Sequence, residues 1–237
     1  LKKLEISPKF DNGLRITYHS KYDTVSSQAH DLKTDAGLDS GLHSMIVCYI
    51  KARMFEDMGD LEKAQESAKG LNLSNSSGML NEEAAKSCDL ACLTVPFAHQ
   101  ENTLKSIGNA LDNKIMIDAT VPLMPPKVMR VQLPQEGSAA LKAQSILGEK
   151  TIVVSAFQNI SAELLQTDAD IECDVLVAGD FIDARSTVIS LVEDAGLKAW
   201  HAGPLCNSAA AEALTSILIA INKKHSLAHS GIKITGH

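Results

Sequence analysis

The sequence predicts an α/β fold built on a parallel β-sheet. The first observation is that residues 88–96 and residues 114–122 are apolar runs with the same ending, Thr-Val-Pro. A short run that is apolar on every side is typical of a strand buried on both faces, as the strands of a parallel sheet are. The second observation is that such runs alternate with helical patterns along the chain, which is typical of α/β proteins.

The composition is that of an ordinary globular protein and limits the partners that we expect. Of the 237 residues, 45% are hydrophobic and 22% are charged, and the formal net charge is −7. Without a basic run, this charge argues against nucleic acid or an anionic membrane as a partner. The longest apolar stretch, around Leu218 and Ile221, is far shorter than the ~20 residues that a membrane span needs, and no signal peptide opens the chain. We therefore expect a cytoplasmic protein whose five cysteines, an odd number without CxxC spacing, are reduced.

The part of the chain before the first Thr-Val-Pro is expected to contain strands and helices in alternation. Residues 15–18 could form a strand, and residues 45–50 have the pattern of a buried strand. Residues 60–69 have a helical pattern that Gly70 ends. Asn81 is expected to cap the helix over residues 81–86, which leads into the first Thr-Val-Pro strand.

The same alternation continues after the second Thr-Val-Pro. Residues 123–137 contain three prolines and are expected to form a loop. The patterns then predict helices over residues 138–147, 183–195 and 209–224, strands over residues 151–157, 173–180 and 198–202, and an edge strand over residues 231–234.

The two Thr-Val-Pro endings indicate where a ligand binds. Ligands of open α/β sheets bind at the carboxyl ends of the strands, and neighbouring parallel strands would bring both endings to one edge. Proline has no backbone N–H and a fixed φ, so each ending is a stiff apolar lip with a threonine hydroxyl beside it. One copy alone is a common strand ending, but two copies together favour a site for a flat ring.

Six separated segments, in this order, carry a resemblance to a known family: residues 93–96, 118–123, 155–162, 178–180, 202–207 and 231–236. From about residue 51 to residue 236, the chain resembles the NADPH-dependent reductases of coenzyme F-420 (F420), the 8-hydroxy-5-deazaflavin carrier. The resemblance implies a Rossmann-type NADP-binding domain over residues 1–150 and a smaller carboxyl-terminal α/β domain over residues 151–237. It also implies an oxidoreductase that passes a hydride directly between NADP(H) and F420 in the cleft between the domains, without a metal or a catalytic side chain. The size of the chain and its apolar terminal helix favour a homodimer.

The resemblance assigns binding roles by position. It places Thr94, Val95, Pro96 and His99 along the nicotinamide half of NADP, with Ala162 touching the same cofactor from the second domain. Lys51 or Arg53, directly after a predicted strand, would meet the 2′-phosphate. The deazaflavin would be held by Val121, Pro122, Gln158, Asn159 and Ile160, and by the turn that contains Gly203, Pro204 and Leu205. Many members of the family have a histidine where Gln158 stands.

Residues 1–50 depart from the pattern of the family, because they contain no GxGxxG turn. Such a turn lets the backbone approach the pyrophosphate. Either this segment has diverged or it is not the native start. Two other functions therefore stay open: a Rossmann reductase that uses NADP with another acceptor, such as a relative of pyrroline-carboxylate or ferric reductases, and a non-catalytic remnant whose cleft binds a ring or a partner protein.

For two further sets of residues, we prefer a structural role to a functional one. His225 and His229 have the spacing of metal ligands but no HExxH-type glutamate, so they are expected to belong to a solvated helix end. Asp118 could be a general base in another context. Since hydride transfer between two cofactors asks the protein chiefly for alignment, we expect Asp118 to orient the end of its strand.

Overall fold

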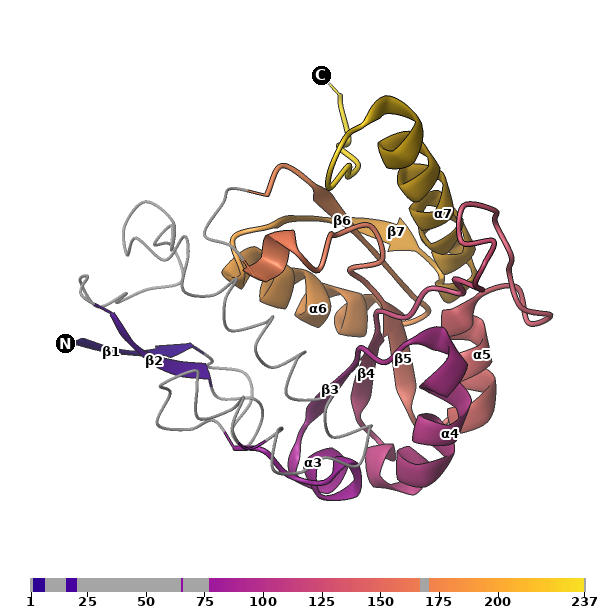
Figure 1. Cartoon of the computed structure of the whole chain (residues 1–237). Helices are drawn as coiled ribbons and strands as arrows, with labels where there is room; N and C mark the ends of the chain where they lie inside the picture. Colours follow the sequence, from indigo (N-terminus) through magenta and orange to yellow (C-terminus); the bar gives the residue numbers. More distant parts are fainter. Residues whose placement is uncertain (1, 7–15, 21–64, 66–76, 167–170, 237) are drawn as a thin grey trace.

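The computed structural model describes residues 2–6, 16–20, 65, 77–166 and 171–236 (Figure 1). Near the start, β1 (Lys2–Ile6) and β2 (Ile16–Ser20) pair antiparallel, so the strand expected at residues 15–18 is present one residue later. The expected strand over residues 45–50 lies outside the described residues. So does the expected helix over residues 60–69, apart from Gln65, which is helical.

The main sheet has five strands in the order β3-β4-β5-β6-β7. They are β3 (Leu90–Leu93), β4 (Ile115–Asp118), β5 (Ile152–Ser155), β6 (Asp174–Gly179) and β7 (Lys198–Gly203). β3, β4 and β5 are parallel neighbours and β6 is parallel to β7, but β6 pairs antiparallel with β5. The α/β Rossmann-type class is therefore confirmed, with one antiparallel step that an apolar run alone does not reveal.

The helices alternate with the strands as the sequence predicts. They are α3 (Asn81–Ser87), α4 (Phe97–Ile107), α5 (Ala139–Leu147), α6 (Ile182–Asp194) and α7 (Ser208–His225), with short 3-10 turns η1 (Gly108–Leu111), η2 (Leu164–Gln166) and η3 (Leu205–Asn207). One predicted cap is wrong: α3 begins with Asn81 inside the helix, and the extended Leu80 precedes it without a side-chain cap.

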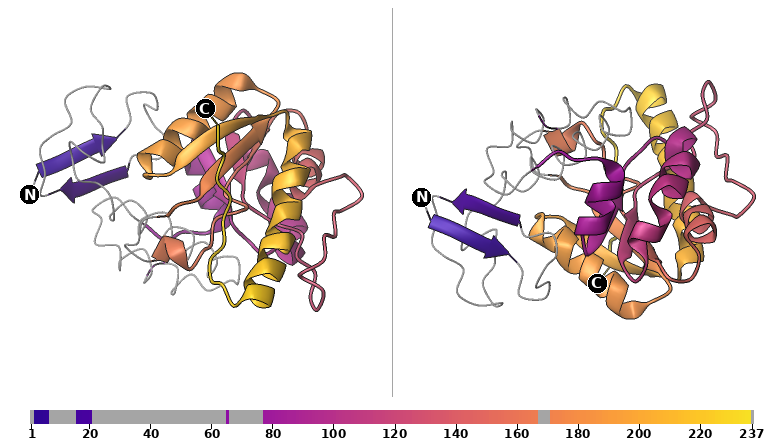
Figure 2. Two further views of the ribbon diagram at one scale, coloured as in Figure 1. Left: turned by 90° about the horizontal axis from the view of Figure 1, so that it is seen from above. Right: turned by 90° about the horizontal axis from the view of Figure 1, so that it is seen from below.

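The two faces of the sheet pack against different helices (Figures 1 and 2). On one face, Leu93, Met116 and Val153 form a core with Leu104 of α4 and Ala143 of α5. On the other face, a second core joins the sheet to α6 and contains Ile117, Val154, Val177, Val188 and Val192. Because β5, β6 and β7 continue the sheet begun by β3 and β4, strands from both sides of residue 150 share these cores. The domain boundary near residue 150 stays a prediction.

The edge strand expected at residues 231–234 does not form. The backbone N–H of Asp174 donates to Ile232 O at 2.8 Å, but the N–H of Ile234 donates to the side-chain Oδ2 of Asp174 at 2.8 Å. Gly231 lies so close to Cys173 that an added Cβ would stand 2.5 Å from Sγ. The tail therefore crosses the start of β6 with one backbone hydrogen bond and side-chain contacts, and not with the ladder of a strand.

One helix in the described part of the chain is long and apolar enough to cross a membrane. It covers Leu205–His225, 21 residues with a mean hydropathy of 1.3, and is longer than the apolar stretch seen in the sequence. A single helix of this kind is weak evidence, because core helices of folded domains have the same length and composition. This helix packs against α5 and β6.

Candidate functional site

The carboxyl ends of β3, β4 and β5 lie side by side. Leu93 is in register with Asp118, and Asp118 with Ser155. Beyond the strands, Ala119 N donates to Leu93 O at 3.0 Å, and Ala156 N donates to Asp118 O at 3.2 Å. We call the three segments that follow, residues 94–96, 119–122 and 156–160, the rim. The structure thus brings together three of the segments that the sequence assigned to ligand binding.

The two Thr-Val-Pro endings are offset by one residue at the rim. Thr94 comes directly after Leu93, whereas Thr120 comes two residues after Asp118, the partner of Leu93 in the register. Since side chains alternate between faces along an extended chain, the offset turns the two threonines to opposite faces. The exposed fractions agree: Val95 and Thr120 are 4% and 2% exposed, whereas Thr94 and Val121 are half-buried. The two endings, which share one sequence, therefore bury different side chains.

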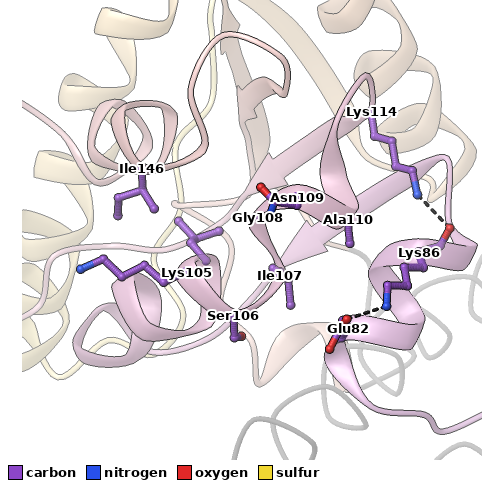
Figure 3. Close-up of a pocket in the computed structure, with 11 residues that line it drawn as sticks. Glu82, Lys86, Lys105, Ser106, Ile107, Gly108, Asn109, Ala110, Lys114 and Ile146 are labelled. Carbon is purple, nitrogen blue, oxygen red and sulfur yellow. Dashed lines mark hydrogen bonds and ion pairs between the residues drawn. The ribbon is translucent and has the colours of Figure 1, made fainter.

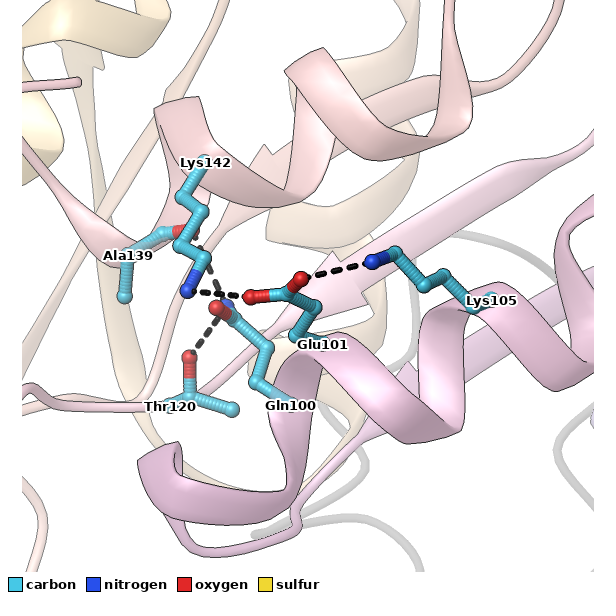
Figure 4. A network of polar contacts seen from close by, with 6 residues as sticks. All are labelled: Gln100, Glu101, Lys105, Thr120, Ala139 and Lys142. Atoms are coloured by element: carbon cyan, nitrogen blue, oxygen red, sulfur yellow. Dashed lines mark hydrogen bonds and ion pairs between the residues drawn. The ribbon is translucent and has the colours of Figure 1, made fainter.

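Thr120 belongs to a buried polar network (Figure 4). Its backbone N–H donates to Asp118 Oδ1 at 2.8 Å. Gln100 Nε2, on α4, lies 2.8 Å from both Asp118 Oδ2 and Thr120 Oγ1 and 3.0 Å from Ala139 O. Burial raises the pKa of Asp118 to about 6, against the opposing effect of these hydrogen bonds. Asp118 is completely buried, which supports its expected role of orienting the strand end.

Gln100 was missed by the sequence analysis. It is completely buried and lies on the same face of α4 as Leu104 and Ile107. The sequence indicated this in one way: Gln100 is a polar residue at a position where the helical spacing predicts an apolar one. Such a residue is buried, and a buried amide requires hydrogen-bond partners.

Thr94 differs from Thr120 because its hydroxyl has no partner. Four buried side-chain atoms of the described residues make no hydrogen bond: Thr94 Oγ1, Gln100 Oε1, Ser155 Oγ and Gln158 Oε1. The other end of the Gln158 amide is fixed, since Nε2 donates to Asp118 O at 2.7 Å. Unpartnered buried polar atoms are rare in folded proteins, and each needs an explanation. Thr94 Oγ1 and Gln158 Oε1 belong to the rim.

The remaining predicted residues of the carboxyl edge have varied surroundings. Asn159 is occupied, because its Nδ2 donates to Ala211 O on α7 at 2.8 Å. Pro122 is buried, Ile160 is half-buried, and Ala162 is exposed beyond the rim. Pro96 is exposed and precedes the first residue of α4.

His99, one turn into α4 as expected, is exposed. Lys51 and Arg53 lie outside the described residues.

The turn before α7 presents less to a ligand than the resemblance implied. Leu205 is 1% exposed and packs in the core beside Leu104 and Val95. Its backbone N–H donates to Asp180 Oδ1 at 2.9 Å. Pro204 is exposed. The structure thus does not bring the Leu205 side chain to an open surface.

Glu212 on α7 is a second residue that the sequence analysis missed. It is 1% exposed and accepts hydrogen bonds from Ala139 N at 2.6 Å and Ala140 N at 3.2 Å. Burial raises its pKa to about 7, and the charge of Asp118 adds to the increase. The sequence indicated this only by the position of Glu212, an acidic residue that falls on the packed face of its helix.

A cavity of about 550 Å³ lies at the opposite end of the sheet (Figure 3). Its lining includes Lys86, Lys105 and Lys114, around the chain that enters β4. These ammonium groups have partners: Lys86 pairs with Glu82, Lys105 with Glu101, and Lys114 donates to Ala85 O at 2.6 Å. Because the cavity surrounds the chain that enters β4, it does not belong to the rim, which follows the carboxyl ends of the strands.

Within residues 77–166 and 171–236, no group of three or more His, Cys, Asp or Glu side chains could hold a metal ion. His229 Nδ1 lies 2.9 Å from Ser161 Oγ and 3.6 Å from Glu163 Oε2.

The sheet and its ligand edge place the chain in the class of Rossmann-type α/β proteins, and the comparisons identify its family. A family model described as NADP oxidoreductase, coenzyme F420-dependent, matches residues 50–122. The F420-dependent NADP reductase of Methanocaldococcus jannaschii is 35% identical over 188 residues, which cover 73% of this chain and 83% of that protein. That of Methanothermobacter thermautotrophicus is 38% identical over 188 residues, which cover 74% and 81%.

The fold agrees with a solved structure of a protein from Arthrobacter sp. FB24 assigned as an F420-dependent NADP reductase. Its TM-score is 0.59 at 21% identity, and the match covers 67% of this chain and 74% of that chain. This likeness concerns the fold alone. From the sequence relatives, the chain belongs to the F420-dependent NADP reductase family.

Proposed function

We propose that this chain transfers a hydride between NADP(H) and coenzyme F420 at the rim. The single observation that carries the proposal is that two of the four buried, unpartnered side-chain atoms of the described residues, Thr94 Oγ1 and Gln158 Oε1, lie at the rim, after β3 and β5. Ligands of Rossmann-type sheets bind at this edge. The family membership gives the two ligands that such an edge would hold.

The residues of the rim fit flat, partly polar rings. Thr94 and Val95 from the first segment, with His99 at the start of α4, would lie along the nicotinamide, and Ala162 would approach it from beyond the third segment. Val121 and Ile160, both half-buried, offer apolar contact to the deazaflavin beside Pro122 and Pro204. Gln158 Oε1 can accept a hydrogen bond from a ring N–H or a carboxamide, because the other end of its amide is already fixed.

The chemistry belongs to the cofactors: when bound, they exchange a hydride between the nicotinamide C4 and the deazaflavin C5. The chain therefore has to set the distance and angle between the rings and to exclude water. The stiff backbone of the rim is suited to this, since Pro96 and Pro122 have restricted φ. Lys51 or Arg53 would select NADP over NAD through its 2′-phosphate.

The setting of the reaction is also a proposal. The acidic charge of −7 supports a cytoplasmic protein with neither nucleic acid nor a membrane as its partner. Ile217 and Ile221, 45% and 38% exposed on α7, support a homodimer that covers this helix.

The experiment is to mix the purified chain with NADPH and oxidised F420 and to follow the deazaflavin absorbance. Loss of the oxidised absorbance at a rate proportional to protein concentration is expected. The same chain should not oxidise NADPH with a pyrroline carboxylate or a ferric chelate. NADPH oxidation with one of these and none with F420 would replace the proposal by another Rossmann reductase. Tight binding of F420 without turnover would favour a non-catalytic remnant.

A further inference from the structure

One face of α7 meets the rim through a stripe of four residues. Ser208, Ala211, Glu212 and Thr215 recur at the spacing of one helical face. Each makes a hydrogen bond to the third rim segment or to the start of α5. Ser208 and Glu212 of this stripe are buried polar residues, and burying a polar group is costly unless it is hydrogen-bonded.

The first route of hydrogen bonds from α7 reaches the third rim segment. Thr215 Oγ1 donates to Gln158 O at 2.8 Å. Asn159 Nδ2 donates to Ala211 O at 2.8 Å. Gln158 Nε2 then donates to Asp118 O at 2.7 Å, so this route ends on the last residue of β4.

The second route reaches the same residue from the other side. Glu212 accepts from the backbone N–H groups of Ala139 and Ala140 at the start of α5. Ala139 O accepts from Gln100 Nε2, which also donates to the carboxylate of Asp118. The two routes close a ring of hydrogen bonds around Asp118, three residues before Val121.

We propose that Glu212 and Thr215 are positioning residues for hydride transfer, which hold the second and third rim segments at a fixed spacing from α7. Neither residue has to touch a cofactor, because each acts through the backbone of the rim or of α5. The predicted effect of these residues on hydride transfer rests on the proposed function. The structural part of the inference, that α7 holds the rim, can be tested without any cofactor.

The positioning role makes a specific kinetic prediction. A displacement of reacting atoms by 1 Å can lower a rate by roughly 10²-fold, so a small shift of one rim segment should reduce hydride transfer more than binding. We expect Thr215→Val and Glu212→Gln to lower the single-turnover rate about tenfold at saturating NADPH and F420, with both dissociation constants within about twofold of the wild type.

Thr215→Ser keeps the hydroxyl and should recover the rate to within about twofold.

Two matched controls exist on α6. Thr187 Oγ1 donates to Asp183 O at 3.0 Å, the same internal helical contact that Thr215 makes to Ala211 O at 3.4 Å, but without a contact to the rim. Thr187→Val therefore tests the loss of a helical hydroxyl alone. Glu193→Gln, at an exposed site of α6, tests the loss of one negative charge. Both variants should transfer hydride at the wild-type rate.

Hydrogen exchange of the cofactor-free protein completes the test. Thr215→Val should speed the exchange of amides in residues 156–160, and Glu212→Gln should speed that of residues 119–121 and 139–142. The α6 controls should leave the exchange of all these amides unchanged. Wild-type exchange in the two α7 variants, or a rate loss in Thr215→Ser equal to that in Thr215→Val, would overturn the inference. A wild-type chain that transfers no hydride would overturn the proposed function and the kinetic role together, while the exchange would still decide whether α7 holds the rim.

Discussion

The two Thr-Val-Pro endings have the same sequence and end neighbouring strands, yet they have different surroundings. Thr120 is buried in a network with Asp118 and Gln100, whereas the buried hydroxyl of Thr94 has no partner. The cause is the one-residue offset between the sequence match and the strand register, in which Leu93 pairs with Asp118. The difference concerns the hydroxyl groups: that of Thr120 helps to hold the rim together, whereas that of Thr94 is free to meet a ligand.

The largest effect is expected from breaking the network at the second ending. Gln100→Leu removes the amide that lies against Asp118 Oδ2, Thr120 Oγ1 and Ala139 O. Buried acceptors left without a donor cost about 1–3 kcal/mol each, so we expect the free energy of unfolding to fall by about 3 kcal/mol in urea titrations. His99→Ala, at the exposed neighbouring position, should change it by less than about 0.5 kcal/mol. Equal losses in the two variants would show that the network contributes nothing.

The network should also make stability depend on pH. Burial raises the pKa of Asp118 to about 6 and that of Glu212 to about 7, so the folded chain holds protons that the unfolded chain releases. The contribution of these protons to the free energy of unfolding is fully present below about pH 4 and is lost as the pH rises to about 7. Each group accounts for about 1.4 kcal/mol per pH unit between its pKa in the unfolded chain and its pKa in the folded chain.

Unfolding free energies of the wild type and of Glu212→Gln between pH 5 and pH 8 give the measurement. The variant should lose one of the two contributions, so its stability should fall less steeply. Parallel pH curves for the two proteins would contradict the assignment to Glu212.

A matched pair of substitutions compares the two endings directly. Thr120→Val removes a hydroxyl that has a buried partner and should lower the free energy of unfolding by about 1 kcal/mol. Thr94→Val removes a hydroxyl without one and should leave the stability within about 0.5 kcal/mol of the wild type, while it weakens NADPH binding or turnover severalfold. If Thr94→Val destabilised the protein as much as Thr120→Val, the two endings would not differ as described.

At the apolar lip, a substitution is expected to affect ligand binding more than stability. Val121 is half-buried at the rim, so Val121→Asp should change the free energy of unfolding by no more than about 1 kcal/mol. A carboxylate against an apolar ring should raise the F420 dissociation constant about tenfold or more. Fluorescence titration with F420 and thermal unfolding measure the two quantities. Loss of the fold in Val121→Asp would place Val121 in the core, and an unchanged F420 affinity in a folded variant would remove Val121 from the site.

The strands that form the rim could be predicted from the sequence because their signal is local. The apolar runs lie within short windows, and the helix expected over residues 138–147 is present as α5, which begins one residue later and ends at Leu147 as expected. The offset between the two endings could not be predicted, because both runs have the same pattern and the register depends on pairing across strands.

The contacts that hold the rim could not be predicted for a different reason. Gln100 meets Ala139 across 39 residues, and Glu212 meets it across 73. A single sequence does not show which distant backbone groups need a partner. The sequence showed only that Gln100 and Glu212 are polar residues on apolar helix faces, and that each therefore needs a hydrogen-bond partner.

The most direct test of the central claim is the fate of the transferred hydrogen. The wild-type chain would reduce F420 with NADPH deuterated at C4, in separate reactions for the two faces of the nicotinamide, and the reduced deazaflavin would be examined by mass spectrometry and NMR. If the rim aligns the rings for direct transfer, deuterium from one of the two labelled forms should arrive at C5 without loss to water. Reduced F420 that carries only solvent hydrogen at C5, or no reduction at all, would contradict direct transfer.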